Sequence, residues 1–134
     1  QMVYLSDYAH HPQEIRQSLL SIRQLYAGKR IKAIFQPHLY TRTRDFYREF
    51  ADALSLLDDV VIVDIYPARE LPIPGVSSKL IFDHLRPGIK RQMCSKEEIC
   101  DIVRQGGLDV LVTLGAGDIE NYADTITQIL TEKR

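Results

Sequence analysis

The sequence has few cysteines, no long hydrophobic run and almost no net charge. Its two cysteines, Cys94 and Cys100, are too few for a disulfide framework and form no CxxC pair, so we expect reduced thiols in a cytosolic protein. The longest aliphatic run, Val60 to Val63, is far shorter than the roughly 20 residues that cross a bilayer, and no stretch has the pattern of a signal peptide. The net charge of -1 argues against nucleic acid as a partner.

Two phosphate-binding motifs are also missing. No GxxxxGK[ST] phosphate loop occurs in the 134 residues. The sequence Gly115-Ala116-Gly117 does not complete the GxGxxG fingerprint, because Glu120 stands at the third glycine position. We therefore expect that this chain alone neither hydrolyses ATP nor ligates a substrate.

Short aliphatic runs alternate along the chain with segments of helical periodicity. Strands are predicted at 3–5, 31–35, 60–63, 88–94 and 109–114. Helical patterns are predicted at 12–26, 46–57, 77–86, 95–103 and 119–130, with a loop rich in proline at 66–75. This alternation predicts one α/β domain over residues 1–134. We expect an open, mostly parallel, Rossmann-like sheet of about five to six strands with helices on both faces.

Four loops follow predicted strands, and open parallel sheets bind ligands outside the carboxyl ends of their strands. The loops are SDYAHHP at 6–12, QPHLYTRT at 36–43, DIYPARE at 64–70 and GAGD at 115–118. Together they carry three of the four histidines, two arginines beside prolines and tyrosines, and a Gly-x-Gly turn. The sequence therefore predicts a binding site at this edge of the sheet.

The loop at 36–43 is the most informative, because His38, Tyr40, Arg42 and Arg44 crowd the start of a predicted helix. Partial positive charge at a helix start disfavours cations there by up to about 1 kcal/mol. A guanidinium suits two-pronged binding of a carboxylate or a phosphate. Either an anionic ligand lies among these side chains, or the arginines are solvated and the cost is negligible.

The other loops also have plain structural readings. Asp7 fits a turn, and the adjacent histidines His10 and His11 fit an exposed loop without the spacing of a known metal site. Gly115 and Gly117 suit either an anion at a helix start or a tight turn alone. Arg69 and Glu70 pair with each other or face solvent, and His84 is structural.

Taken in order, the motifs DYAHHP, FQPHLYTRTRDF, IYPARELPIPG and GAGD resemble the C-terminal domain of the Mur ligases over essentially the whole chain. The QPHLYTRT string favours the member of the family that adds L-alanine. The alternative within the family is the murein-peptide recycling ligase, which typically has EPRSNT at this position. Outside the family, the alternatives are a free-standing nucleotide- or anion-binding module and a small interaction domain.

The resemblance implies a piece of a three-domain bacterial cytoplasmic enzyme whose N-terminal and central ATPase domains lie outside residues 1–134. Such enzymes use ATP and Mg²⁺ in peptidoglycan precursor synthesis, within cell wall biogenesis. They convert the carboxylate of UDP-N-acetylmuramate to an acyl phosphate, which the amine of L-alanine attacks. No cofactor or metal is expected to be bound permanently by this domain, and no membrane partner is expected.

Carried over by motif, the resemblance implies that Asp7 binds the ribose and Tyr8 the adenine of the nucleotide. It implies that His10, His38 and Arg42 line the L-alanine and acyl-phosphate region. The further candidates are His11, Tyr40, Arg44, Gly115 and Gly117, and no residue is assigned as catalytic. Two departures from the family pattern stand out. Leu39 replaces the arginine of a PHR motif, and Ser6 replaces a second aspartate.

Overall fold

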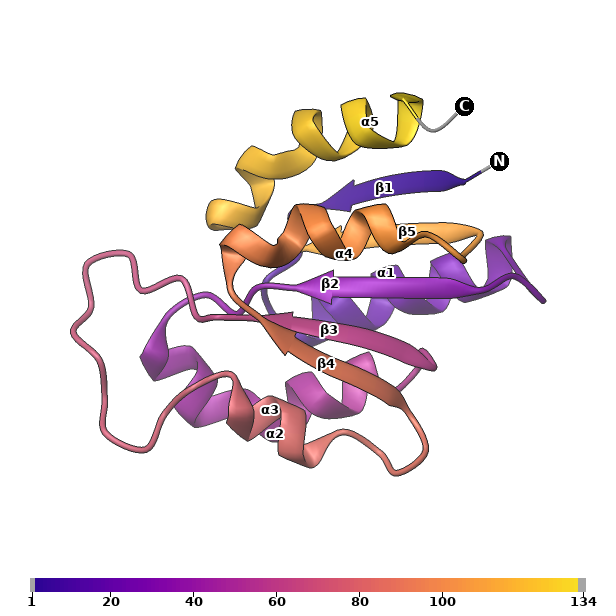
Figure 1. The fold of residues 1–134 in the computed structure, drawn as a ribbon. Coiled ribbons are helices and arrows are strands. Elements are labelled where there is room, and N and C mark those ends of the chain that lie inside the picture. The colour runs from indigo at the N-terminus through magenta and orange to yellow at the C-terminus, as the bar shows by residue number, and fades with distance from the viewer. Residues whose placement is uncertain (1, 133–134) are drawn as a thin grey trace.

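A computed structural model describes residues 2–132 and confirms the α/β architecture (Figure 1). The strands are β1 (Val3–Asp7), β2 (Ile31–Phe35), β3 (Asp59–Val63), β4 (Lys90–Cys94) and β5 (Val110–Leu114). The helices are α1 (Pro12–Leu25), α2 (Tyr40–Leu54), α3 (Lys79–His84), α4 (Ile99–Gln105) and α5 (Ala123–Glu132). Two 3-10 helices, η1 (Lys96–Glu98) and η2 (Asp118–Tyr122), precede α4 and α5.

The five strands form one parallel sheet in the order β1-β5-β2-β3-β4. The chain steps outward from β1 through β2 and β3 to β4, and then returns to insert β5 between β1 and β2. The connections α1, α2 and α3 cover one face, whereas α4 and α5 cover the other (Figure 1). Loops leave β5 and its neighbours toward opposite faces, which is where an open α/β sheet forms a ligand crevice.

The core lies on both faces of the sheet, because each central strand is apolar on both sides. In β3, Val60 and Ile62 pack toward α1, α2 and α3, while Val61 and Val63 pack toward α4 and α5. The predicted edge strand at 88–94 is confirmed as β4, which lies at the edge of the sheet beside β3 and has three exposed residues out of five.

The second helix differs from its prediction in both position and buried face. It starts at Tyr40, before the apolar pattern predicted from residue 46 and close to the arginines predicted at its start, and it ends at Leu54, so Leu57 lies beyond it. Phe46, predicted to be on the buried face, is 44% exposed. The face that packs on the sheet is centred on Phe50 and Leu54, and small alanines between them allow close packing.

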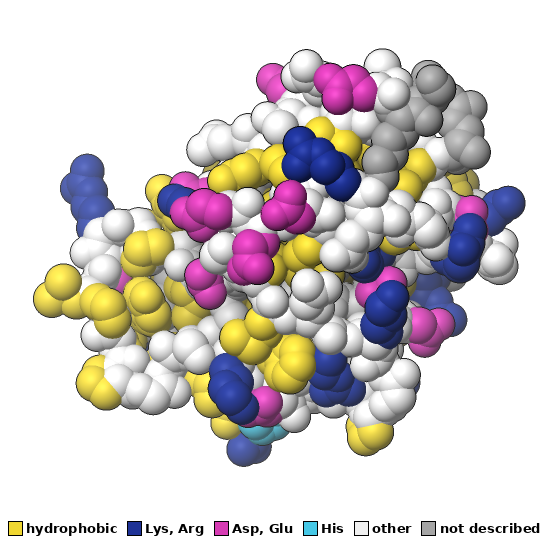
Figure 2. Space-filling view, viewed as in Figure 1, with side chains coloured by type: hydrophobic (Ala, Val, Ile, Leu, Met, Phe, Trp, Pro, Cys, Tyr) yellow, Lys and Arg dark blue, Asp and Glu magenta, His cyan; other side chains and the backbone are white. Residues whose placement is uncertain are grey.

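No helix in the part of the chain that the structure describes is long and apolar enough to cross a membrane. Figure 2 shows charges of both signs distributed over the visible face. Hydrophobic side chains gather instead on the left, over the long loop that joins β3 to α3 (Figures 1 and 2). Leu71 in this loop is 83% exposed. The loop projects from the carboxyl edge of the sheet.

Candidate functional site

The four predicted loops meet at the carboxyl edge of the sheet. The backbone N–H of Gly115 donates to the carbonyl of Asp7 at 3.2 Å, which ties the fourth loop to the first. The N–H of Tyr66 donates to the carbonyl of Pro37 at 2.8 Å, which ties the third loop to the second. A Cβ placed on Gly117 would lie 2.4 Å from Cγ of Tyr66. The prediction that these loops share one edge is therefore confirmed.

A row of rings runs along this edge. The ring centroids of Tyr8 and His10 are 5.7 Å apart, those of His10 and His38 are 5.9 Å apart, and those of His38 and Tyr66 are 5.4 Å apart. Nδ1 of His10 lies 3.1 Å from the carbonyl oxygen of Tyr8. A carbonyl only accepts, so this nitrogen donates, and Nε2 of the neutral ring is left as an acceptor. The row joins three of the four loops.

His38 and Arg42 hold polar atoms without protein partners. Nδ1 of His38 and Nη1 of Arg42 are buried and have no hydrogen-bond partner among residues 2–132. Burial lowers the pKa of His38, and the positive charges of Arg42 and His10 lower it further, against a smaller opposing effect of Glu70. A buried guanidinium nitrogen without an acceptor is expensive. This pair is therefore suited to a ligand that brings anionic oxygens.

The start of α2 is held by a residue from another loop. Its N-cap, Leu39, has no side-chain oxygen and adopts φ 75°. Glu70 supplies the acceptors instead, because its Oε1 accepts from the N–H of Thr41 at 3.1 Å and its Oε2 accepts from the Thr41 hydroxyl at 2.5 Å. Hydrogen bonding to Thr41 lowers the pKa of Glu70. The sequence reading assigned Glu70 no such role.

The two arginines at this helix start have different surroundings. Arg44 is exposed and its Nε lies 2.9 Å from Oδ1 of Asp45, an ion pair open to solvent. Arg42 is half-buried with its orphaned nitrogen. The two alternatives, an anionic ligand and solvation, therefore apply to different arginines. Arg44 fits the solvated alternative, and Arg42 fits the ligand. Tyr40 is the first residue of α2 and is half-buried.

Asp7 and Tyr8 follow β1 directly. Oδ1 of Asp7 accepts from the N–H of Ala9 at 2.8 Å, so this residue does shape the turn, as the structural reading expected. Its Oδ2 has no protein hydrogen bond within the described chain and remains able to accept from a hydroxyl group. Tyr8 is 58% exposed, an apolar ring at the surface of the edge.

The glycines of the GAGD turn have a packing reason within the chain. Gly115 has φ 141°, and a Cβ there would lie 2.9 Å from the carbonyl oxygen of Gln36. Gln36 is itself buried, and its Oε1 accepts from the N–H of Ile119 at 2.8 Å. These contacts support the tight-turn alternative for Gly115 and Gly117, while contact with an anion stays a prediction. Gln36 was missed, although a glutamine directly after an apolar strand is a signal of a buried amide.

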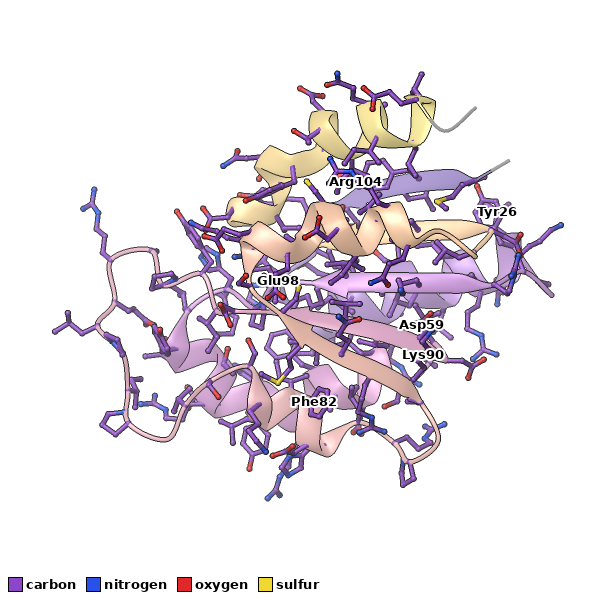
Figure 3. All side chains as sticks on the ribbon, viewed as in Figure 1. Tyr26, Asp59, Phe82, Lys90, Glu98 and Arg104 are labelled. Atoms are coloured by element: carbon purple, nitrogen blue, oxygen red, sulfur yellow. The ribbon has the colours of Figure 1, made fainter. Side chains whose placement is uncertain are left out.

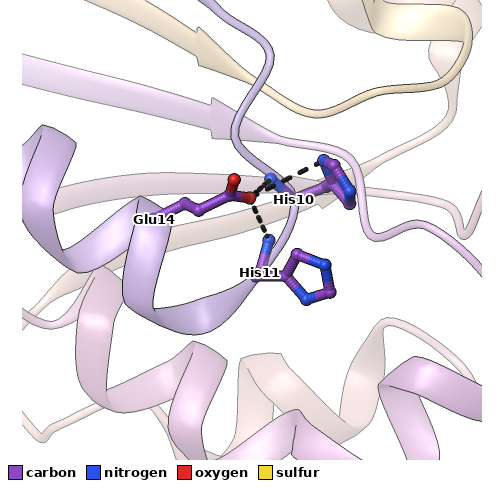
Figure 4. Close-up of side chains that lie close together, drawn as sticks. All are labelled: His10, His11 and Glu14. Atoms are coloured by element: carbon purple, nitrogen blue, oxygen red, sulfur yellow. Dashed lines mark hydrogen bonds and ion pairs between the residues drawn. The ribbon is translucent and has the colours of Figure 1, made fainter.

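His10 and His11 lie beside Glu14, four residues after His10, a spacing that the sequence reading overlooked (Figure 4). Oε1 of Glu14 accepts from the N–H groups of His10 at 3.3 Å and His11 at 3.1 Å, and these bonds lower the pKa of Glu14. The ligand atoms of the three side chains lie within 4.8 Å of one another. Oε1 of Glu14 already accepts from two backbone N–H groups, and Nδ1 of His10 already lies against the carbonyl of Tyr8. Glu14 thus serves as a cap for α1, and we assign no metal here.

A separate hollow of about 620 Å³ opens at the other end of the sheet. Tyr26, Asp59 and Lys90 are among its lining residues, and Figure 3 shows them at the amino ends of the strands. Glu98, in η1 after the carboxyl end of β4, lies on the side of the candidate site (Figure 3). The hollow is therefore not part of the site.

Comparisons with known proteins agree with this geometry. The family model described as "Mur ligase, glutamate ligase domain" matches residues 1–119. The UDP-N-acetylmuramate–L-alanine ligase of Phocaeicola vulgatus is 66% identical over 132 residues, 98% of this chain and 29% of that protein. The ligase of the same name from Parabacteroides distasonis is 53% identical over 99% of this chain and 29% of its own length. The chain thus spans under a third of the relatives it matches.

Two solved structures are similar as well. The UDP-N-acetylmuramate–alanine ligase of Thermotoga maritima aligns with a TM-score of 0.76 and 28% identity, over 98% of this chain and 27% of that one. A murein peptide ligase from Psychrobacter arcticus aligns with a TM-score of 0.72 and 20% identity, over 95% of this chain and 27% of that one, which shows the shared fold. With its motifs gathered at one edge of this sheet, the chain belongs to the Mur ligase family and corresponds to the family's C-terminal, glutamate ligase domain.

Proposed function

We propose that this chain is the C-terminal domain of a UDP-N-acetylmuramate–L-alanine ligase of the bacterial cytoplasm. The whole enzyme would use ATP to activate the carboxylate of UDP-N-acetylmuramate as an acyl phosphate. The L-alanine amine then attacks the acyl carbon, an amide forms and phosphate leaves. The sequence identity to ligases of this name supports the assignment. The N-terminal and central domains would supply the UDP-sugar site and the phosphate loop that this chain lacks.

Within this proposal, the residues of the carboxyl edge complete a pocket whose other half belongs to the central domain. The free Oδ2 of Asp7 is suited to accept from a ribose hydroxyl, and the exposed ring of Tyr8 is suited to pack on an adenine. His10, His38 and Arg42 would line the L-alanine and acyl-phosphate region. Mg²⁺ would neutralise the phosphates of ATP and be held by the central domain.

The observation that carries the proposal is the pair of orphaned atoms, Nδ1 of His38 and Nη1 of Arg42. They lie in and just after the loop that follows β2, next to β5, where the connections leave the sheet toward opposite faces. A loop at this point is expected to face a ligand. A carboxylate or phosphate oxygen would satisfy the buried guanidinium nitrogen. Closure of the domains over this site would also exclude water, which could otherwise hydrolyse an acyl phosphate. Electrostatic stabilisation of this kind is usually a large contribution to phosphoryl and acyl transfer.

The test is Arg42→Ala in the full-length ligase that contains this domain. A charge-assisted hydrogen bond contributes roughly 1.5–3 kcal/mol, so kcat/KM for L-alanine should fall by about tenfold to a hundredfold. Steady-state kinetics with varied L-alanine measure this, and urea unfolding checks that the fold is intact. The matched control is Arg48→Ala, which removes an exposed arginine from the same helix. Unchanged kinetics in Arg42→Ala would remove this residue from the site.

A further inference from the structure

The start of α2 lacks the features that normally stabilise a helix N-terminus. The N-cap residue, Leu39, cannot accept a hydrogen bond with its side chain, and the first turn contains no acidic residue. Instead it carries Arg42, whose charge is unfavourable beside the partial positive charge of the helix start. Some other group must hold this turn in place, because its geometry determines where Arg42 and the preceding His38 point.

Glu70 is the group that holds it. Both of its carboxylate oxygens are used on one residue, with Oε1 on the backbone and Oε2 on the hydroxyl of Thr41. Thr41 lies between His38 and Arg42 in the chain, so the two-point contact fixes the segment that joins them. The contact spans 29 residues in sequence and comes from the loop after β3.

The same two loops are joined a second time, through Tyr66. Tyr66 accepts from the N–H of Leu39 at 2.8 Å and donates to the carbonyl of Pro37 at 2.8 Å, and its ring packs against His38. Tyr66 therefore holds the 37–39 segment, and Glu70 holds Thr41, two residues after that segment. The negative charge of Glu70 raises the pKa of His38, whereas the positive charge of Arg42 lowers it, so the carboxylate lies within electrostatic range of the site.

We propose that Glu70 is a positioning residue for L-alanine or acyl-phosphate binding, which holds the β2–α2 turn so that His38 and Arg42 face the ligand. This inference rests on the proposed function, because it assigns Glu70 a role in the same site. Glu70 itself need not touch substrate. Its carboxylate provides the negative charge that a side chain at the N-cap would otherwise supply, and it leaves the nitrogen of Arg42 free for the ligand.

The experiment measures kcat/KM for L-alanine in the full-length ligase with Glu70→Ala, Glu70→Gln and Thr41→Ala. Misplacement of binding groups by about 1 Å costs up to about a hundredfold, so Glu70→Ala should lose at least about tenfold. Glu70→Gln keeps one accepting oxygen and should recover part of that loss, and Thr41→Ala should fall between wild type and Glu70→Ala. Glu49→Ala, which removes an exposed carboxylate from the middle of α2, should stay within about twofold of wild type.

A double-mutant cycle with Arg42→Ala separates positioning from general stability. If Glu70 acts by positioning His38 and Arg42, then adding Glu70→Ala to Arg42→Ala should cost clearly less than Glu70→Ala costs alone, because only the part carried by His38 remains. Independent, multiplicative losses would overturn the positioning role. The positioning role would also be overturned if Glu70→Ala had the same kinetics as Glu49→Ala while Arg42→Ala was impaired. The proposed function would then stand. An unimpaired Arg42→Ala would instead remove Arg42 from the site, and with it the observation on which the proposed function and this inference both draw.

Discussion

Arg42 and Arg44 are two positions apart and chemically identical, yet of the two only Arg42 has a buried nitrogen without a partner among the described residues. Residues two apart on a helix point to different sides. Which side each takes depends on the rotation of the first turn, and the φ of 75° at Leu39 and the contact of Glu70 with Thr41 set that rotation. Neither is readable from local sequence, so the residue types alone left both arginines as candidates, and only the resemblance to the family favoured Arg42.

The pKa of His38 depends on the charges around its ring and can therefore be used to test them. Its pKa is lowered first by burial and then by the positive charge of Arg42, so removing that charge favours the protonated ring. Arg42→Ala should therefore raise the pKa of His38 toward the ordinary 6.5, and Glu70→Gln should lower it further. An NMR titration of the imidazole signals in each variant measures this, with Arg48→Ala as the control. An unchanged His38 titration in Arg42→Ala would contradict the assigned surroundings.

At the scale of elements, the turn between β5 and η2 is fitted to the loop after β3. A Cβ on Gly117 would lie 2.4 Å from Cγ and 2.7 Å from Cβ of Tyr66, closer than packed atoms approach. Tyr66 has little room to move, because its backbone is bonded on both sides to the 37–39 segment. Gly117→Ala should therefore lower the free energy of unfolding by about 1–3 kcal/mol, as overpacking does.

Urea unfolding of Gly117→Ala measures this cost, and Gly75→Ala is the matched control. Gly75 has φ 80° with open space around the missing Cβ, so alanine there carries only the cost of the left-handed backbone, about 1–2 kcal/mol. The two variants differ in a second readout. Only Gly117→Ala should shift the His38 imidazole signals, because Tyr66 packs on that ring. Signals that stay in place, with wild-type stability, would show that the turn does not depend on this contact.

Local signals predicted some elements well and others poorly. The strand at 31–35 has the predicted bounds, and the segment predicted as helical from residue 95 does contain η1 and α4. The group that holds the start of α2 was not predicted, because the usual local cap is missing there. Its cap comes from Glu70 across 29 residues, so no local pattern contains it.

At the scale of the whole molecule, alternation of strands and helices predicted the parallel sheet and the edge where the loops gather. It did not predict the insertion of β5 between β1 and β2, since β4 connects to β5 through a helix much like those before it. The order follows from α4 crossing the opposite face, which is decided by the packing of two whole faces. The gathering of the four loops was still predicted correctly, because every carboxyl end of a parallel sheet lies on the same edge whatever the order of the strands.

A pattern of the whole chain also predicts how it responds to acid. Glu14, Glu98 and Asp109 each accept backbone N–H groups, and this bonding lowers the pKa of each carboxyl below its ordinary value of 4.5 or 3.8. Below those ordinary values the unfolded chain binds protons more readily than the folded one, so stability that is present at neutral pH is lost as pH falls. His38, with its lowered pKa, acts in the same direction from about pH 6.5 downward.

The urea midpoint should therefore fall as the pH is lowered from about 5 to about 3. Glu98→Gln tests the cause, because an amide cannot titrate but retains an accepting oxygen. The variant should begin with a lower midpoint at pH 7, since the charge-assisted bonds to Ser95 are weakened, and should then lose less than wild type as acid is added. Parallel curves for the two proteins would mean that this carboxylate does not contribute to the acid response. A flat wild-type midpoint over the same range would mean that the backbone-bonded carboxylates do not stabilise the fold through their ionised forms.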